Sequence, residues 1–201
     1  MLEWPFQINN NHCMAHPSPP QILLLFAHPF PHRSKVNRVL LDGVRDLPGV
    51  EVDDLYERYP DFHIDIRFEQ ERLRKIDLLV VQHPFYWYSA PAIFKQWQDM
   101  VLEHGFAFGS TGTALRGKDW LSVVTVGQRV EAYLPEGHNR HSVKELLLPY
   151  ECAANHCGMH YLEPFIIHGA QRLDPDELVR WTAAYRDRLS NYRPGGENVD
   201  G

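Results

Sequence analysis

The stretch ILLLFAHPFPHRSKVN, residues 22–37, determines how the fold begins. Its first six residues, Ile22 to Ala27, form an unbroken apolar run, as is typical of a parallel strand that is buried on both faces. Ser34 stands where a helix N-cap is expected. The segment from Lys35 to Asp46 then places apolar side chains at helical spacing, at Val36, Val39, Leu40 and Val44. The stretch therefore predicts a strand, a proline-rich loop and a helix.

The same alternation continues along the rest of the chain. Four further strands are predicted, at Val50–Leu55, Asp77–Gln82, Trp120–Val126 and, near an edge because of Pro164, Tyr161–Ile167. Between the strands we expect a helix over Arg67–Lys75 and a second helix that has Pro91 at its first position. A third helix is expected over Val143–His156, ended by Gly158. A last helix is expected to begin at the capping box of Asp174. Five strands separated by helices predict a parallel α/β sheet with right-handed crossovers.

Two of these helices have a clear apolar face. In the helix that follows Pro91, the inward positions are Ile93, Trp97, Met100 and Val101. In the last helix they are Leu178, Trp181, Tyr185 and Leu189. The simplest interpretation of Trp97, Trp181 and Tyr185 is that they are core residues.

Composition excludes several classes of function. The chain has 201 residues, of which 20 are Lys or Arg and 26 are Asp or Glu, so its net charge is −6. A mildly acidic chain without a basic stripe is a poor candidate for binding nucleic acid. The longest apolar run is too short to span a bilayer. Three cysteines without a CxxC spacing argue against a disulfide framework.

The length favours one domain, which we place at 21–190. Residues 1–20 are rich in proline and lack the basic and apolar regions of a signal peptide, so they are predicted to be an N-terminal extension. Residues 191–201 are rich in Gly and Asn and are predicted to be a frayed C-terminal tail. These features favour a cytoplasmic protein.

Ligands of parallel α/β sheets bind beyond the carboxyl ends of the strands. After the first strand, His28 to Asn37 brings a hydroxyl, an amide, a cation and a helix N-terminus together, which suits a phosphate. An ordinary βα loop capped by Ser34 is the alternative. After the third strand, Phe85 to Tyr88 supplies four consecutive aromatic residues, which can stack on a flat ring or form a hydrophobic plug or dimer patch.

After the fourth strand, Thr125, Val126, Gly127 and Gln128 precede a long irregular stretch to Arg140. Gly127 permits the backbone to approach a ligand closely. A phosphate cradle, an aromatic wall and a glycine-bearing loop at three successive strand ends predict a mononucleotide site, and a flavin fits it better than a dinucleotide.

Four strings resemble one known family: AHPFPHRSKVN, LYERYPDFHIDI, QHPFYWYSAPAIFKQWQD and GTALRGK. They are similar to the flavodoxin-fold NAD(P)H:quinone oxidoreductases and, more narrowly, to the ancillary proteins of glutathione-regulated potassium-efflux systems. The resemblance covers residues 22–189 and implies the sheet order 2-1-3-4-5.

The resemblance also implies a function. A cytoplasmic homodimer would pass a hydride from NAD(P)H through FMN to a quinone, with FAD as an alternative flavin. A second possibility is a flavin-bound regulatory subunit of a potassium/proton antiporter with little turnover, held at the inner face of the membrane by that partner.

Residue roles follow from the same resemblance. His28, Ser34, Lys35, Val36 and Asn37 would hold the flavin phosphate and ribityl chain. Phe85, Tyr86, Trp87 and Tyr88 would line the ring, and Thr125, Val126, Gly127 and Gln128 would close over its edge. Tyr133 and His138 would be catalytic, facing the quinone.

One loop departs from the family pattern, which has Thr-Thr-Gly-Gly where this chain has Thr125-Val126-Gly127-Gln128. The Gln128 side chain could narrow the approach to the ring. Other clusters are weaker candidates. Cys152, His156 and His160 recur every four residues but lack a carboxylate partner for a metal, and Asp61, His63 and Asp65 could simply fix a turn or a dimer contact. A serine hydrolase is excluded because no GxSxG string is present.

Overall fold

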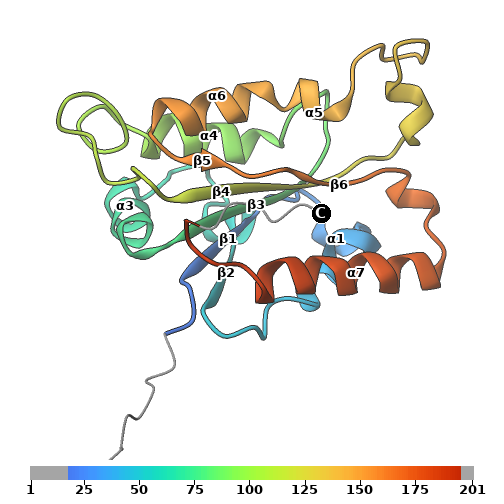
Figure 1. Ribbon diagram of the computed structural model, residues 1–201, viewed down its shortest axis with the longest axis horizontal. Coiled ribbons are helices and arrows are strands. Elements are labelled where there is room, and N and C mark those ends of the chain that lie inside the picture. Colours follow the sequence, from blue (N-terminus) through green and yellow to red (C-terminus); the bar gives the residue numbers. More distant parts are fainter. Residues whose placement is uncertain (1–17, 196–201) are drawn as a thin grey trace, which may run out of the picture.

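The computed structural model describes residues 18–195, which form a parallel sheet with helices on both faces (Figure 1). The strand order is β2-β1-β3-β4-β5, and β6 also pairs with β4. The strands are β1 Ile22–Phe26, β2 Val50–Asp54, β3 Leu78–Pro84, β4 Asp119–Thr125, β5 His160–Tyr161 and β6 Phe165–Ile167. The predicted class and order are confirmed, but the sheet has six strands because the expected strand Tyr161–Ile167 is interrupted around Pro164.

The helices form two layers, with α4, α5 and α6 over one face of the sheet and α1 and α7 over the other, while α3 packs beside α4 (Figure 1). Their bounds are α1 Lys35–Asp42, α2 Leu55–Arg58, α3 Ile66–Lys75, α4 Ala92–Val101, α5 Val143–Leu146, α6 Leu148–His156 and α7 Pro175–Ser190. Three short 3₁₀ helices are η1 Pro31–Arg33, η2 Val130–Tyr133 and η3 Ala170–Arg172.

Strand β1 contributes to two separate cores, which explains its unbroken apolar run. Leu23 and Leu25 pack in the core under α3, α4 and α6, whereas Leu24 and Phe26 pack in the core under α1 and α7. Alternate residues of a strand point to opposite faces of the sheet, so a strand covered on both faces must be apolar throughout.

Several predicted helix boundaries are wrong by a few residues. The first helix ends at Asp42 rather than Asp46, with Gly43 as its C-cap. The predicted helix Val143–His156 divides at Leu147, because Pro149 cannot donate to a preceding turn. Pro91 occupies the N-cap rather than the first helical position. Met100 was expected to point inward but is 37% exposed.

The two chain ends were predicted to be an extension and a tail. Residues 1–17 and 196–201 lie outside the described part of the chain. Within it, Tyr192 is buried, and its hydroxyl donates to a carboxylate oxygen of Asp119 at 2.7 Å. This residue of the predicted tail is therefore packed against the domain. Among the helices of residues 18–195, none is long and apolar enough to cross a membrane.

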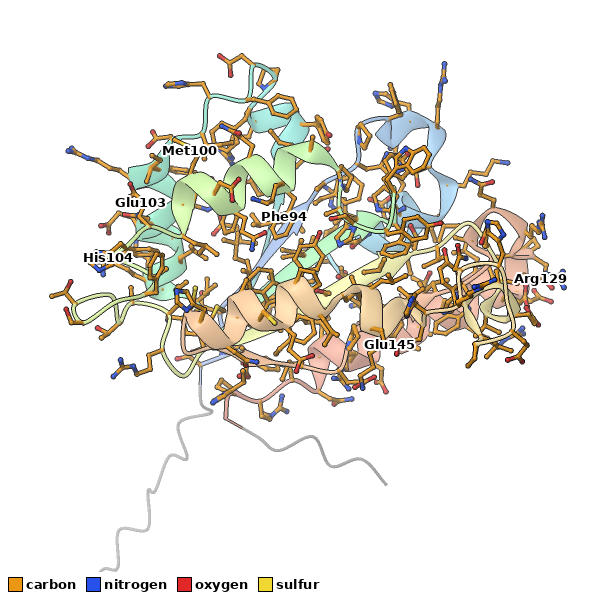
Figure 2. The ribbon with its side chains drawn as sticks, turned by 90° about the horizontal axis from the view of Figure 1, so that it is seen from above. Phe94, Met100, Glu103, His104, Arg129 and Glu145 are labelled. Atoms are coloured by element: carbon orange, nitrogen blue, oxygen red, sulfur yellow. The ribbon has the colours of Figure 1, made fainter. Side chains whose placement is uncertain are left out.

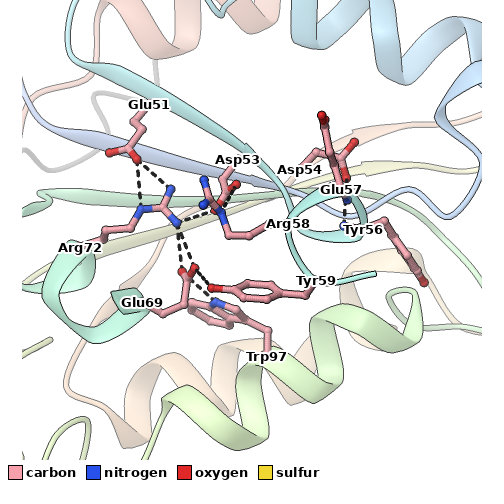
Figure 3. A network of polar contacts seen from close by, with 10 residues as sticks. All are labelled: Glu51, Asp53, Asp54, Tyr56, Glu57, Arg58, Tyr59, Glu69, Arg72 and Trp97. Atoms are coloured by element: carbon pink, nitrogen blue, oxygen red, sulfur yellow. Dashed lines mark hydrogen bonds and ion pairs between the residues drawn. The ribbon is translucent and has the colours of Figure 1, made fainter. Parts of the chain in front are cut away.

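A buried polar network joins β2, α2, α3 and α4 (Figure 3). We call it the Glu69 cluster; it consists of Asp53, Arg58, Tyr59, Glu69, Arg72 and Trp97. The side chain of Glu69 is fully buried and accepts hydrogen bonds from the Tyr59 hydroxyl at 2.6 Å, from Trp97 Nε1 at 3.0 Å and from Arg72 at 3.1 Å. Burial and the neighbouring Glu69 carboxylate together raise the pKa of Tyr59, so its hydroxyl remains a donor.

Two acidic residues beside this cluster have a local structural role. Asp65 caps α3 by accepting from the Phe68 amide at 3.0 Å, and Asp61 accepts from the His63 amide at 3.0 Å. Both contacts are between near neighbours in the chain, as in capping and Asx turns. They therefore fix a turn, one of the two roles expected for this acidic segment.

Candidate functional site

The loop after β1 leads into the N-terminus of α1. Ser34 caps this helix, because its Oγ accepts from the Asn37 amide at 3.3 Å. The side-chain Nδ2 of Asn37 donates to Ser34 Oγ at 3.1 Å and to Thr125 Oγ1 at 2.7 Å. Asn37 thereby ties the loop after β1 to the end of β4. The other amides in the first turn of α1 have no partner within the helix, and such a helix N-terminus favours a bound anion.

His28 begins this loop and is buried. Its Nδ1 accepts a hydrogen bond from the Phe30 amide at 3.0 Å, and burial lowers its pKa. His28 is therefore a neutral ring at neutral pH, and positive charge in the loop comes from Arg33 and Lys35.

The four aromatic residues after β3 form a tight turn, which we call the aromatic turn (residues 85–88). The amide of Tyr86 donates to Ser89 O at 2.9 Å, and the amide of Ser89 donates back to Tyr86 O at 3.0 Å. Between them, Trp87 and Tyr88 have φ angles of +48° and +65°. Two successive positive φ angles are the signature of a type I′ turn, which normally contains Asn and Gly.

Such a backbone is strained for aromatic residues and persists only when its surroundings hold it. Three hydrogen bonds from the end of β4 and from α6 hold this turn. The Phe85 amide donates to Thr125 O at 2.8 Å, and the Tyr150 hydroxyl contacts both the Ala90 amide at 2.8 Å and Ser89 Oγ at 2.7 Å. The ring of Trp87 is nevertheless 93% exposed. Strain that presents an apolar ring to solvent indicates a functional surface.

Two hollows lie at this end of the sheet. The large hollow, of about 850 Å³, is lined by the loop after β1, the start of the aromatic turn, the end of β4 and the segment 170–178. The small hollow, of about 240 Å³, is lined by Phe85, Trp87, Tyr88, Gly127, Gln128, Tyr133 and Asn139. Phe85 and Gly127 line both, so the two hollows adjoin.

The predicted site residues divide between these hollows. Nine line the large one: His28, Ser34, Lys35, Val36, Asn37, Phe85, Tyr86, Thr125 and Gly127. Four others line the small one: Trp87, Tyr88, Gln128 and Tyr133. Residues from three separate loops are thus assembled at the strand ends, as the sheet topology predicts. In Figure 2 this end of the molecule is marked by Arg129, and the opposite end by His104.

Two predicted residues are placed elsewhere. The Val126 side chain is buried in the core under α4 and α6, and its amide donates to Ile167 O at 2.8 Å. Its side chain is therefore in the core and its amide is already paired, so the predicted role of Val126 at the ring edge stays a prediction. His138 is exposed and lines neither hollow.

Sequence reasoning missed three residues of this region. Asn139 lines the small hollow, and Tyr150 holds the aromatic turn from α6. His168, directly after β6, places its ring 5.5 Å from that of Tyr133. A histidine that follows a strand is a signal available in the sequence. The roles of Asn139 and Tyr150 depend on contacts across 51 and 60 residues, which no local pattern reveals.

The metal alternative gains no support from geometry. Within residues 18–195, no three His, Cys, Asp or Glu side chains gather as metal ligands. Cys152 is exposed whereas Cys157 is buried, and burial raises the pKa of the Cys157 thiol. That shift disfavours the reactive thiolate.

The fold and the site define an α/β protein of the flavodoxin type, in which the loop 28–37 and the aromatic turn line a hollow at the carboxyl edge of the sheet. The chain belongs to the family described as having a flavodoxin-like fold, which matches residues 20–189. Among curated relatives, the glutathione-regulated potassium-efflux system ancillary protein KefG of Pectobacterium carotovorum is 50% identical over 179 residues, covering 89% of this chain and 98% of the relative. Both the broad and the narrow resemblance are therefore confirmed.

Solved structures agree on the fold. A protein described as an NADPH-quinone reductase from P. pentosaceus is 31% identical, with a TM-score of 0.79 and coverage of 86% of this chain and 99% of that one. General stress protein 14 from Treponema denticola, solved in complex with FMN, is 36% identical, with a TM-score of 0.78 and coverage of 85% and 98%.

A further structure carries a different activity in its name. It is described as a thermophilic tryptophan halogenase from Streptomycin violaceusniger and is 39% identical, with a TM-score of 0.82 and coverage of 86% and 99%. Since one fold supports many activities, the activity of this chain must be argued from its own site.

Proposed function

We propose that the chain is an FMN-dependent NAD(P)H:quinone oxidoreductase. The observation that carries this proposal is the large hollow, where an anion cradle and the aromatic turn open into one cavity at the strand ends. A mononucleotide flavin needs a phosphate site and a flat apolar wall within one cavity. Of the two similar structures, one is described as an NADPH-quinone reductase and the other was solved in complex with FMN.

The cradle fits a phosphate and a ribityl chain. The N-terminus of α1, with Lys35 and the nearby Arg33, would bind the phosphate. The buried Oδ1 of Asn37 has no hydrogen-bond partner among the described residues. A hydroxyl of the ribityl chain is the kind of donor that this oxygen lacks, and buried acceptors without one are rare.

The aromatic turn fits the ring. Neither Trp87 nor Tyr88 uses its amide in a backbone hydrogen bond within the described chain, so both amides are available to ring oxygens and nitrogens. Phe85 and Tyr86 supply apolar surface at the bottom of the cavity. When bound there, the flavin supplies the hydride chemistry, and the protein supplies position and electrostatics.

The small hollow adjoins this position and would hold the nicotinamide or the quinone in turn. Burial raises the pKa of Tyr133, so its phenol stays protonated and can donate to a quinone oxygen. His138 is exposed and lines neither hollow, so its catalytic role stays a prediction.

The experiment that tests this function is cofactor release. The purified chain is incubated with FMN or FAD, separated from free flavin, denatured, and its flavin is quantified. About one FMN per chain, followed by quinone-dependent oxidation of NADH or NADPH, supports the proposal. A folded protein that retains no flavin would refute it, and retention of FAD alone would correct the cofactor.

We also propose that the active form is a cytoplasmic homodimer built from the domain 21–190. The exposed rings of Phe30, Trp87 and Tyr88 beside the site support this, because large apolar groups at one edge favour a partner. Sedimentation of the flavin-loaded protein tests it, and a monomer at micromolar concentration would count against it.

A second function is favoured by the curated relatives. Their name, ancillary protein of a potassium-efflux system, applies to proteins that match this chain over 92% to 98% of their length. The chain would then regulate a potassium/proton antiporter and lie at the inner face of the membrane through that partner. Binding to antiporter-containing vesicles with negligible quinone turnover supports this role, whereas rapid turnover without such binding supports the enzyme.

A further inference from the structure

A chain of side-chain hydrogen bonds connects three loops above the small hollow. The hydroxyl of Tyr88 donates to Asn139 Oδ1 at 3.0 Å, and Asn139 Nδ2 donates to Gln128 Oε1 at 2.8 Å. We call this the amide bridge. It joins the aromatic turn, the loop after η2 and the loop after β4, and all three residues line the small hollow.

The centre of the amide bridge is held in place by the backbone. The amide of Asn139 donates to Ala132 O at 2.8 Å, which brings the loop back onto η2. Both side-chain functions of Asn139 are therefore used while its own position is fixed. Tyr88 lies at the second strained position of the aromatic turn, so its ring is held from one side by the turn and from the other by Asn139.

Gln128 is the residue that completes the amide bridge. Its Oε1 accepts the hydrogen bond from Asn139 Nδ2, and only a side chain with such an oxygen can close the bridge at this position. Gln128 also lines the small hollow, beside Tyr88 and Asn139.

We propose that Gln128, acting through Asn139 and Tyr88, is a specificity-determining residue that limits the electron acceptor to compact, single-ring quinones. This inference rests on the proposed function. The amide bridge fixes the Tyr88 ring as a wall, so a second fused ring meets Tyr88 and Gln128 instead of open space. A pocket with fixed walls discriminates by about 10- to 200-fold for a change of one methylene group.

The first test measures kcat/KM for 1,4-benzoquinone and for the two-ring quinone menadione in the FMN-loaded enzyme. The variants Gln128→Gly, Asn139→Ala and Tyr88→Phe each remove one part of the amide bridge. We expect each to raise the menadione-to-benzoquinone ratio, by about tenfold for Gln128→Gly, because the wall is released. Differences in intrinsic quinone reactivity cancel when variants are compared with the parent protein.

Two control variants make this test specific. Gln128→Glu retains an oxygen that accepts from Asn139, so it should keep the parent ratio. Asn155→Ala removes an exposed asparagine on α6, far from the bridge in sequence, and should also leave the ratio unchanged. An unchanged ratio in all three bridge variants, with FMN bound and turnover intact, would overturn the size limit alone.

The second test needs no flavin. Hydrogen exchange followed by mass spectrometry is measured on flavin-free protein for segments 84–90 and 130–140. If the amide bridge holds these loops together, Asn139→Ala and Tyr88→Phe should accelerate exchange in both segments, and Asn155→Ala in neither. Equal exchange in all proteins would refute the bridge as a restraint. A parent protein without FMN or turnover would instead refute the proposed function, and the acceptor limit with it.

Discussion

The Glu69 cluster and the aromatic turn show two opposite ways of using polar and aromatic side chains. In the cluster, Asp53, Glu69 and Arg72 are buried and each carboxylate is paired, which connects β2 to three helices (Figure 3). In the turn, the backbone is strained and the Trp87 ring is left in solvent. The first arrangement stabilises the fold. The second leaves the Trp87 ring and the amides of Trp87 and Tyr88 without partners in the described chain, so that a ligand can contact them.

The largest expected effect comes from breaking the Glu69 cluster. Glu69→Ala leaves Arg72, Tyr59 and Trp97 without their shared acceptor, and removing one partner of a buried pair costs about 3–5 kcal/mol. We therefore expect urea unfolding to show a loss of that size. FMN bound per folded chain should stay unchanged, because the cluster does not line either hollow.

The matched control is Glu71→Ala on the same helix. Glu71 is exposed and lies 3.8 Å from Arg74, and such surface pairs contribute about 0–1 kcal/mol. Equal losses in the two variants would show that burial of Glu69 contributes nothing special to stability.

His83 lies between the two regions, fully buried under the aromatic turn and stacked on Phe94. Burial lowers its pKa to about 4. The unfolded chain binds a proton near pH 6.5 while the folded protein does not, so stability falls as the pH drops from 6.5 toward 4. For this shift we expect the free energy of unfolding, measured with urea, to fall by about 2 kcal/mol between pH 7 and pH 5.

Substitution of His83 separates this group from the other histidines. His83→Gln should make the loss between pH 7 and pH 5 smaller, whatever its stability at pH 7. His156→Gln removes an exposed ring and should leave the pH dependence as it was. The same slope in all three proteins would assign the acid sensitivity to other groups.

A substitution in the aromatic turn is expected to raise stability, by less than the losses above. Trp87→Gly removes a side chain from a position with φ of +48°, where glycine carries no strain. We expect the free energy of unfolding to rise by about 1 kcal/mol, because the exposed ring contributes little packing. FMN retention should fall by about three- to tenfold through loss of stacking surface. Lower stability together with unchanged retention would contradict both assignments.

The sequence predicts the fold well wherever the local signal and the tertiary outcome agree. The apolar run at Ile22, the Ser34 cap and the capping box at Asp174 all lead to the expected elements. The three loops at the strand ends are also located correctly, because the topology of a parallel sheet brings them together whatever their detailed conformation.

What the sequence could not show depends on contacts between distant segments. The segment Arg67–Lys75 is predicted as a charged helix, yet Glu69 and Arg72 are buried because β2 and α4 supply their partners. The sequence of the aromatic turn contains no Gly or Asn that would indicate positive φ at Trp87 and Tyr88. The break at Leu147 is different, since Pro149 was a readable signal.

The smallest expected change in stability concerns Ser34, whose hydroxyl caps α1 and which also lines the large hollow. Ser34→Gly should cost only a few tenths of a kcal/mol, because glycine is also accepted at an N-cap. It removes the proposed donor to the phosphate and one of the two acceptors of Asn37 Nδ2, so FMN affinity measured by fluorescence titration should fall by about tenfold.

Ser142→Gly is the control, because Ser142 caps α5 in the same manner and lines neither hollow. We expect it to cost a similar few tenths of a kcal/mol and to leave FMN affinity unchanged. If the two serine variants lose affinity equally, the loss reflects general loosening of the fold. If only Ser34→Gly loses it, one side chain serves both the helix and the ligand, and the division between structural and binding residues does not hold at the start of α1.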